Sequence, residues 1–401
     1  MTACVRNPDW VKRYYPDVHT ITADFTRDHD TETWLSRLHS IDAVVNCIGI
    51  IKEHSKQTFE YLHTKAPCAL FKACDIAKVR KVIQISALGA DDTASSEYHL
   101  SKKAADECLS QRALDWTILM PSIVYGHGAK SMAFFKALAA LPLTPLVDTG
   151  NQPIQPVHID DLCHAVIKAL HTNQLSHKRI DVVGPAPVTM RALYTTLKTW
   201  LGMKHAIFIS LPYGASLFAA RVAGFMGNTP LTYETVQMLK KGNTGNVASY
   251  IEATGITPRP FEQTIMKTPP LPGDIHYAKH FFLIPLLRIT LAVLWIVTGY
   301  ISAFVYPIEL SFSMLAKVGI GQTLAPLALY SAAALDVILG FTLLINYRVR
   351  LVALVQIILM VSYSILITIG LPDLWIHPFG PVTKNIPLIV ATLLILSVTR
   401  K

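Results

Sequence analysis

The last third of the chain, from Phe281 onward, is almost continuously apolar, and this constrains the fold more than any other feature. Crossing the hydrocarbon of a bilayer takes roughly 20 apolar residues. Segments that approach or reach this length lie at 289–306, 324–345, 351–370 and, the shortest, 386–398. We therefore expect residues 281–401 to form an all-α bundle of about four transmembrane helices.

Positive charges flank these segments unevenly. Two of the connections carry only Lys317 and Lys384. The charges at the other connection and at both ends of the bundle are Lys279, Arg288, Arg348, Arg350, Arg400 and Lys401. Positive residues favour the cytoplasmic side, and the first residues lack the pattern of a signal peptide. We expect a multi-pass protein of the cell inner (plasma) membrane, with its N-terminal domain and C-terminus in the cytoplasm.

Asp336 lies near the middle of the second apolar segment. An unpaired acid there costs a few kcal/mol even on the lenient insertion scale, so its side chain should face inward. We expect an ion pair with Arg288, whose long side chain starts at the cytoplasmic end of the first segment. A proton-transfer or quinone-binding role is the alternative.

Composition limits the partners of the rest of the chain. The formal charge of +9 is scattered, without a basic stripe interleaved with aromatic residues, which argues against nucleic acid and suits a face beside anionic lipid. The six cysteines show no zinc-like spacing, so we expect no metal site and interpret them as small buried side chains in a reducing compartment.

Residues 1–265 alternate between short β-rich runs and helical patterns, with a linker at 266–280 and a small substrate lobe at about 211–261. This alternation predicts an α/β fold, a Rossmann-like doubly wound parallel sheet that binds ligands at the carboxyl ends of its strands. The predicted strands are 2–5, 19–22, 43–48, 82–86, 116–119 and 180–183. The predicted helices are 31–38, 59–77, 98–112, 132–140, 159–170 and 190–201.

Four local patterns occur in a characteristic order. A buried strand ends at Ser86, Tyr98-His-Leu-Ser-Lys102 opens a helix, and Pro121-Ser-Ile-Val-Tyr-Gly126 and Gln155-Pro-Val-His-Ile-Asp-Asp161 follow later strands. Together they resemble the extended or atypical short-chain dehydrogenases, of the NAD(P)-dependent epimerase/dehydratase kind, and in particular the NADH-dehydrogenase accessory-subunit branch. The apolar tail resembles a DoxX-type membrane domain, through its spans and its Phe-Gly-Pro…Lys-Asn loop.

Tyr98 and Lys102 are four residues apart, so on a helix they share one face. An ammonium there can lower the pKa of the phenol and let it exchange a proton with an alcohol or carbonyl. Ser86, at a strand's carboxyl end, can hydrogen-bond the same oxygen. The family resemblance implies that Tyr98 is the general acid/base, Lys102 its tuner and a ribose contact, and Ser86 the substrate polariser. A surface Tyr and Lys on an ordinary helix is the alternative.

Further residues are candidates for cofactor contact. Asn46 and Gly49 end the strand nearest the expected nicotinamide, where a glycine allows close backbone approach, although a plain tight turn also explains them. The resemblance places Pro121 and Ser122 at the border of the nicotinamide. Met120 stands where many relatives have Arg.

The phosphate-binding motif of such a site, Gly-x-x-Gly-x-x-Gly after a first strand, is missing from this sequence. Residues 2–8 resemble the second strand and its turn, so we expect an N-terminus truncated by roughly one strand–loop–helix unit. Without that unit, cofactor affinity should be low or absent. Arg6 follows this strand where an arginine suits a 2′-phosphate, which favours NADP over NAD, and Asp24 can lie near the adenine.

These observations support two functions. The first is a membrane-anchored NAD(P)-dependent oxidoreductase or epimerase that acts on a hydroxyl or carbonyl group of a small molecule. The second is a non-catalytic, nucleotide-sensing or scaffold subunit of a membrane redox complex, with a redox partner or quinone nearby.

Overall fold

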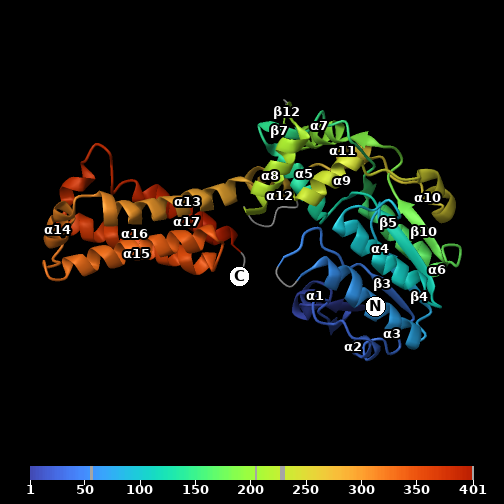
Figure 1. Ribbon diagram of the computed structural model, residues 1–401. Helices are drawn as coiled ribbons and strands as arrows, with labels where there is room; N and C mark the ends of the chain where they lie inside the picture. The colour runs from blue at the N-terminus through green and yellow to red at the C-terminus, as the bar shows by residue number, and fades with distance from the viewer. Residues whose placement is uncertain (55–56, 204–205, 226–230, 400–401) are drawn as a thin grey trace. The chain divides into compact units, whose positions relative to one another are not determined.

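The computed structural model describes residues 1–401 except 55–56, 204–205, 226–230 and 400–401 (Figure 1). The chain divides into two compact units, Met1–Ala278 and Lys279–Lys401. The first mixes strands and helices, whereas the second is helical among the residues described. The segment expected as a linker includes a helix, α12 (Pro272–His280), whose first residue is a proline, as suits a helix start.

A four-stranded parallel sheet forms the centre of the first unit, in the order β10-β5-β4-β3. Its strands are β3 (Ala43–Asn46), β4 (Lys81–Ile85), β5 (Asp115–Pro121) and β10 (Lys178–Val182). The pairings Ala43↔Lys81, Val82↔Trp116 and Ile180↔Leu119 set the register, so all four strands end at one edge. The predicted parallel sheet is confirmed, with strand ends shifted by one or two residues.

Both faces of this sheet are covered by helices, as its apolar central strands require. Val82 and Ile118 pack on one face against side chains of α2 (Thr31–Leu35), α3 (Ala66–Ile76) and α4 (Glu97–Ser110). Their neighbours Ile83 and Leu119 pack on the other face against α6 (Ile159–His171) and α10 (Val247–Thr254). The alternation of strand side chains thus builds two separate cores.

The first two strands form a sheet of their own, in which β1 (Thr2–Val5) pairs in parallel with β2 (His19–Thr22). Among the described residues, β1 pairs only with β2 and β3 only with β4. In the predicted doubly wound order, one further strand lies between β1 and β3. The six predicted strands therefore make two parallel sheets rather than one.

A smaller lobe has its own core, centred on Tyr125, Met132, Leu193 and Tyr194. In it, β7 (Leu143–Val147) pairs in parallel with β12 (Ile207–Leu211). Its helices are α5 (Lys130–Ala140), α7 (Met190–Trp200), α8 (Tyr213–Phe225), α9 (Tyr233–Lys241) and α11 (Phe261–Lys267). The shorter elements of this unit are α1 (Pro8–Tyr14), the π-helix Glu60–Lys65, β6 (Val124–Tyr125), β8 (Pro153–Ile154), β9 (Val157–His158) and β11 (Val188–Thr189).

The cysteines are less uniform than the sequence suggested. Cys74 is buried, but Cys4, Cys47 and Cys163 are exposed. The remaining pair, Cys68 of α3 and Cys108 of α4, forms a disulfide with its Cα atoms 5.9 Å apart. Periodicity alone did not separate these cases, because the exposure of each cysteine depends on what the tertiary structure places over it.

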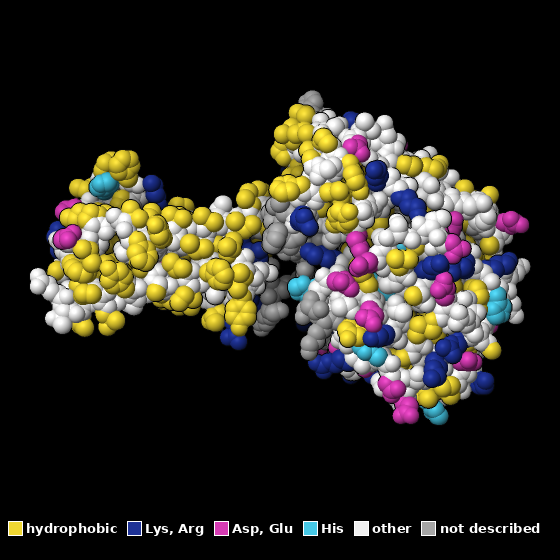
Figure 2. All heavy atoms as spheres, viewed as in Figure 1, with side chains coloured by type: hydrophobic (Ala, Val, Ile, Leu, Met, Phe, Trp, Pro, Cys, Tyr) yellow, Lys and Arg dark blue, Asp and Glu magenta, His cyan; other side chains and the backbone are white. Residues whose placement is uncertain are grey.

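The second unit is an α-helical bundle with an apolar outer surface (Figure 2). Three segments of the described chain are long and apolar enough to cross a membrane: Pro272–Val305, Ala325–Leu344 and Val349–Gly370. The fourth predicted segment is a shorter apolar helix. The helices are α13 (Leu283–Tyr300), the π-helix Ile301–Val305, α14 (Ile308–Lys317), α15 (Ala325–Leu344), α16 (Val349–Gly370), the 3-10 helix Pro372–Trp375 and α17 (Asn385–Val398).

The predicted Arg288–Asp336 ion pair is wrong. Arg288 donates instead to the side-chain carbonyl of Asn346, just beyond α15. Asp336 is ten residues earlier on that helix, about 15 Å away along its axis, which is beyond the reach of Arg288. Asp336 is buried, as predicted, and its Oδ1 has no hydrogen-bond partner among the described residues.

Candidate functional site

Helix α4 brings the predicted site residues to the carboxyl edge of the sheet. Ser96 caps its first turn by accepting from the backbone N–H of His99. Tyr98, Lys102 and Asp106 then recur at intervals of four residues, so they share one face of the helix. The capping serine marks where the helix begins, and the four-residue spacing places the three side chains on one face.

Lys102 is buried, and its ammonium links two strand ends. Its Nζ donates to the backbone carbonyls of Ile48 (2.9 Å) and Ile85 (3.1 Å), which follow or end β3 and β4. Burial lowers the pKa of Lys102 to about 8, although Asp106 and Cys47 oppose the shift. Lys102 is therefore mostly protonated at neutral pH, and its pKa lies only about one unit above that pH.

The Tyr98 ring lies among other rings. Its centroid is 5.5 Å from that of His63 and 6.0 Å from that of Phe59, both edge to face. No described residue hydrogen-bonds its hydroxyl, and burial raises the pKa of Tyr98 to about 12. The expected lowering of this pKa is wrong for the chain alone, because Lys102 donates to carbonyls and desolvation dominates.

His63 is a buried residue that the sequence analysis missed. Its Nε2 accepts from the backbone N–H of Ile50 (2.9 Å), so its other nitrogen, Nδ1, carries the proton. That nitrogen lies 2.9 Å from Ser101 Oγ, which donates to the carbonyl of Tyr98. Burial and the charge of Lys102 lower the pKa of His63 to about 3, so it is neutral. His63 thus ties the loop after β3 to the turn that carries Tyr98.

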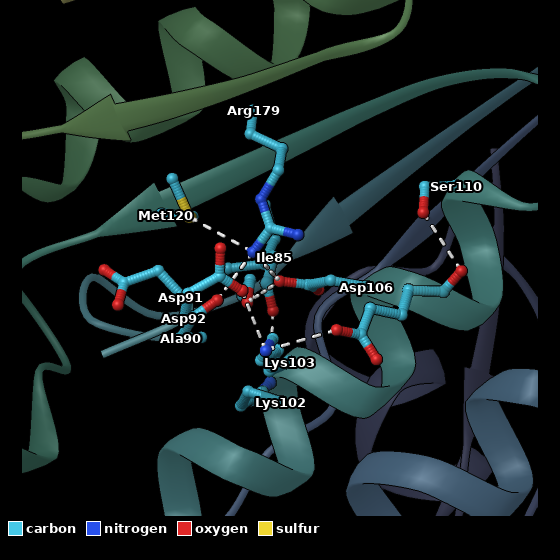
Figure 3. Close-up of polar contacts among 12 residues, drawn as sticks. Ile85, Ala90, Asp91, Asp92, Lys102, Lys103, Asp106, Ser110, Met120 and Arg179 are labelled. Carbon is cyan, nitrogen blue, oxygen red and sulfur yellow. Dashed lines mark hydrogen bonds and ion pairs between the residues drawn. The ribbon is translucent and has the colours of Figure 1, made fainter. Parts of the chain in front are cut away.

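Ser86 forms a buried polar pair with Asp106, and the more exposed Arg179 contacts the same carboxylate; the sequence had pointed to neither Asp106 nor Arg179. Ser86 Oγ donates to Asp106 Oδ2 at 2.5 Å, and Arg179 lies 3.3 Å from the same oxygen. Figure 3 shows Arg179 reaching from β10 toward Asp106 and Met120, with its terminal nitrogen also on the carbonyl of Ala90 (2.6 Å). The hydroxyl hydrogen of Ser86 is therefore committed to Asp106.

Asp106 should make the stability of the protein depend on pH. Burial raises its pKa to about 6, above the usual 3.8, although Ser86, Arg179 and Lys102 oppose the shift. Because the folded state holds this proton more tightly, stability should fall as pH rises from about 4 to about 6 and then level off. Two pH units correspond to about 3 kcal/mol.

Asp106→Asn should remove this decline, so the variant gains stability over the wild type between pH 4 and pH 7. Thermal unfolding of the full chain at each pH measures the difference. Asp17→Asn, at an exposed position, is the matched control. An unchanged difference between Asp106→Asn and wild type across this range would contradict the assignment.

Asn46, Gly49 and Ser122 lie at the predicted edge of the sheet. Other residues of the protein already hydrogen-bond the two polar side chains and fill the space beside the glycine. Asn46 Nδ2 donates to Gln84 Oε1 (2.7 Å), and Ser122 Oγ donates to the carbonyl of Gln155 (2.5 Å). A Cβ on Gly49 would lie 3.2 Å from Lys102 Nζ, so this glycine admits the lysine. Pro121 ends β5, and its carbonyl accepts from the N–H of Leu88.

Arg6 and Asp24 lie after the ends of β1 and β2, on the separate two-stranded sheet. Arg6 is exposed and has no ion-pair partner within the described part of the chain. Burial acts to raise the pKa of Asp24, but hydrogen bonds from Thr26 outweigh it and lower that pKa overall. Both residues therefore lie at one edge of the two-stranded sheet. The structure does not bring them together with Tyr98 and Lys102 of α4.

These residues match the two ends of a dinucleotide better than its middle. Lys102 and Ser122 lie at the carboxyl edge of the sheet, where they could hold a nicotinamide ribose, and the exposed Arg6, whose charge also acts on Asp24, could pair with a phosphate on the adenosine. The glycine-rich turn that would hold a pyrophosphate is missing from the sequence.

A cavity of about 460 Å³ lies between α4, the strand ends and the smaller lobe, within the size range of small-molecule sites. His99 lines it, together with Ser95 and Ser96 from the start of α4. His99 Nδ1 lies 3.0 Å from Ser96 Oγ, and the ring donates to the carbonyl of Leu88. A His directly after the Tyr of Tyr-x-x-x-Lys was the available signal for this residue.

Comparison with known proteins agrees with this arrangement. Residues 1–134 match the NAD(P)H-binding family and residues 292–393 match the DoxX-like family. The mouse (Mus musculus) protein NADH dehydrogenase [ubiquinone] 1 alpha subcomplex subunit 9, mitochondrial, is 25% identical over 228 residues, which cover 55% of this chain and 59% of that protein. Ceramide reductase of Caulobacter vibrioides is 23% identical over 149 residues, which cover 37% and 46%. The chain thus spans about half the length of the curated relatives it matches.

Among solved structures, an NADPH-dependent quinone oxidoreductase from Escherichia coli, complexed with NADPH, superposes with a TM-score of 0.54 at 15% identity. The match covers 66% of this chain and 89% of that one, and it supports the fold alone. Residues 1–134 are therefore similar to NAD(P)H-binding proteins and residues 292–393 to DoxX-like proteins, and the chain is distantly similar to the NADH dehydrogenase accessory subunit.

Proposed function

We propose that the protein is a membrane-anchored, NADP-preferring oxidoreductase that reduces a carbonyl group. The observation that carries this proposal is the pairing of Tyr98 and Lys102 on one face of α4, with the Lys102 ammonium at the carboxyl ends of β3 and β4. A bound NADPH would supply hydride at that edge. A phenol whose pKa is raised to about 12 holds its proton at neutral pH, which suits donation to a carbonyl oxygen.

The other site residues have supporting roles in this proposal. Lys102 holds the strand ends and lies close to its titration point, so it can contact a ribose and stabilise negative charge near Tyr98. Ser86 can accept, but not donate, a hydrogen bond while its proton lies on Asp106. Asn46, Gly49, Pro121 and Ser122 would border the nicotinamide. Asp24 would lie near the adenine.

The proposed organisation is an SDR domain at 1–265 with a substrate lobe at about 211–261, a linker at 266–280 and a transmembrane domain at 281–401. We propose a cell inner membrane location with the first domain and the C-terminus in the cytoplasm. α17, with 14 residues, is about 21 Å long. A fourth span would therefore need neighbouring residues or local thinning of the bilayer.

A second candidate is a nucleotide-sensing or scaffold subunit of a membrane redox complex. The specific observation that favours it is the internal use of the site: Ser86 is bound to Asp106 and Lys102 to two carbonyls. The mouse relative's name, a subunit of NADH dehydrogenase, points the same way.

Cofactor binding separates the two candidates in part. NADPH fluorescence on titration into the full chain in lipid nanodiscs should show saturable but weak binding, because the glycine-rich turn that would hold the pyrophosphate is missing from the sequence. Arg6→Ala should weaken NADPH binding about tenfold and leave NADH binding unchanged, because a charged hydrogen bond to a phosphate contributes about 1.5 kcal/mol or more. Arg13→Ala, an exposed arginine on α1, is the control. Absence of binding to both cofactors would reject the enzyme proposal.

A further inference from the structure

The cavity beside α4 is apolar over most of its wall. Its lining includes Phe134, Phe135 and Leu138 of α5 and Met238 and Leu239 of α9. These residues come from two helices of the smaller lobe, facing the strand ends of the sheet. A wall of aromatic and long aliphatic side chains favours a ligand with an extended apolar part.

One group of polar side chains lines the cavity where α4 begins. Ser95, Ser96 and His99 line it there, close to the turn that carries Tyr98. Ser96 and His99 are hydrogen-bonded to each other. This end therefore offers the hydroxyls of Ser95 and Ser96 to a small polar head, because both ring nitrogens of His99 already have protein partners.

The charges in the lining argue against a nucleotide sugar as the ligand. Within the described lining, Lys241 is the only Lys or Arg, and its Nζ donates to the carbonyl (2.5 Å) and Oγ1 (2.7 Å) of Thr93. Asp91 and Asp181 also line the cavity and would repel phosphates. A diphosphate is usually bound by several cationic side chains, whereas the described lining has one.

The outer side of the same lobe is also apolar. Ile207 of β12 is 56% exposed and Phe218 of α8 is 70% exposed, while Leu211 of β12 and Ala219 of α8 line the cavity. Figure 2 shows hydrophobic side chains gathered over β7 and β12 at this edge. β12 and α8 therefore each contribute to an exposed apolar surface and to the wall of the cavity. The same chain carries three helical segments long and apolar enough to cross a bilayer.

We propose that this cavity binds an amphiphile with a long hydrocarbon chain and a small uncharged polar head, taken up from the membrane surface. The hydrocarbon lies between α5 and α9, and the head lies at Ser95, Ser96 and His99. The placement of a reacting carbonyl in that head rests on the function proposed above, but binding itself does not.

Photolabelling of the full chain in lipid nanodiscs tests the proposal. The probe is a sixteen-carbon alcohol that carries a diazirine on its chain. Labelled peptides mapped by mass spectrometry should include 131–147 and 231–244, and excess hexadecanol should remove this label whereas UDP-glucose should not. Met238→Trp, which fills the wall, should reduce labelling of 131–147 about tenfold, and Leu138→Phe should reduce labelling of 231–244 severalfold.

Ile167→Trp, at an exposed position of α6, is the control and should label as the wild type does. The proposal would be overturned if UDP-glucose removed the label from the two peptides. It would also be overturned if both cavity variants were labelled as strongly as the wild type. Because labelling needs neither NADPH nor turnover, its failure leaves the reductase assignment standing with another substrate class. Failure of NADPH binding with labelling intact would instead reject the reductase and keep the amphiphile site.

Discussion

Replacing Tyr98 with Phe should reduce kcat by about 10²–10⁴-fold while NADPH binding and folding stay unchanged. The substitution removes one hydroxyl that no described residue hydrogen-bonds, so it leaves no buried partner unsatisfied. The ring contacts with Phe59 and His63 remain. A defect confined to turnover therefore identifies the phenol as the proton donor.

The measurement is NADPH oxidation by the full chain in nanodiscs with long-chain ketones as substrates, beside NADPH fluorescence for binding. Tyr61→Phe is a matched control, since Tyr61 is a partly buried tyrosine that stacks on His29 outside the α4 face. Turnover that persists in Tyr98→Phe would reject this tyrosine as the acid. Loss of NADPH binding together with turnover would indicate a structural role instead.

Replacing Gly340 with Leu should strongly destabilise the helical unit. A Cβ at Gly340 would lie 2.7 Å from the backbone carbonyl oxygen of Ala292, and one at Gly299 would lie 2.5 Å from that of Ala333. These contacts run in opposite directions along α13 and α15, so the two helices are antiparallel and touch through their backbones. Membrane helices associate through such small residues because close approach provides their packing.

A leucine at Gly340 cannot move away from a backbone carbonyl, so α13 and α15 must separate. We expect a loss of about 2–3 kcal/mol, typical of severe overpacking, seen as a lower unfolding midpoint of the full chain in mixed micelles. Ala334→Leu on the same helix is the matched control, because Ala334 is exposed. Equal midpoints for the two variants would contradict close packing at Gly340.

Features that depend on residues close together in the chain were predictable from the sequence, and features that depend on distant residues were less so. The Tyr98–Lys102 face was predictable because a spacing of four residues on a helix is a local property. The parallel sheet and the apolar helices were predictable for the same reason, since each depends on a repeat within a few residues. Strand pairing was less predictable: the sequence suggested one sheet, and the structure has β1–β2 apart from the other four strands.

The partners of the polar groups around the site were not predictable. Asp106, Arg179 and His63 come from different elements, and their contacts span 73 residues between Asp106 and Arg179 and 38 between His63 and Ser101. Arg288 was assigned the wrong partner because helix length, rather than charge, decided which group it could reach. The pKa of Tyr98 was predicted in the wrong direction for a related reason, since burial is a property of the whole fold.

By itself, the sequence determined that this protein has an α/β unit with a Tyr-x-x-x-Lys helix and an apolar helical tail. Hydrophobic period, chain length and residue spacing act over a few residues, and they need no knowledge of the rest of the chain. Only the tertiary structure decided that Lys102 and Ser86 donate their hydrogen bonds to acceptors within the protein, and where the apolar cavity lies. Those outcomes depend on desolvation and on contacts between residues far apart in the chain, which no local pattern encodes.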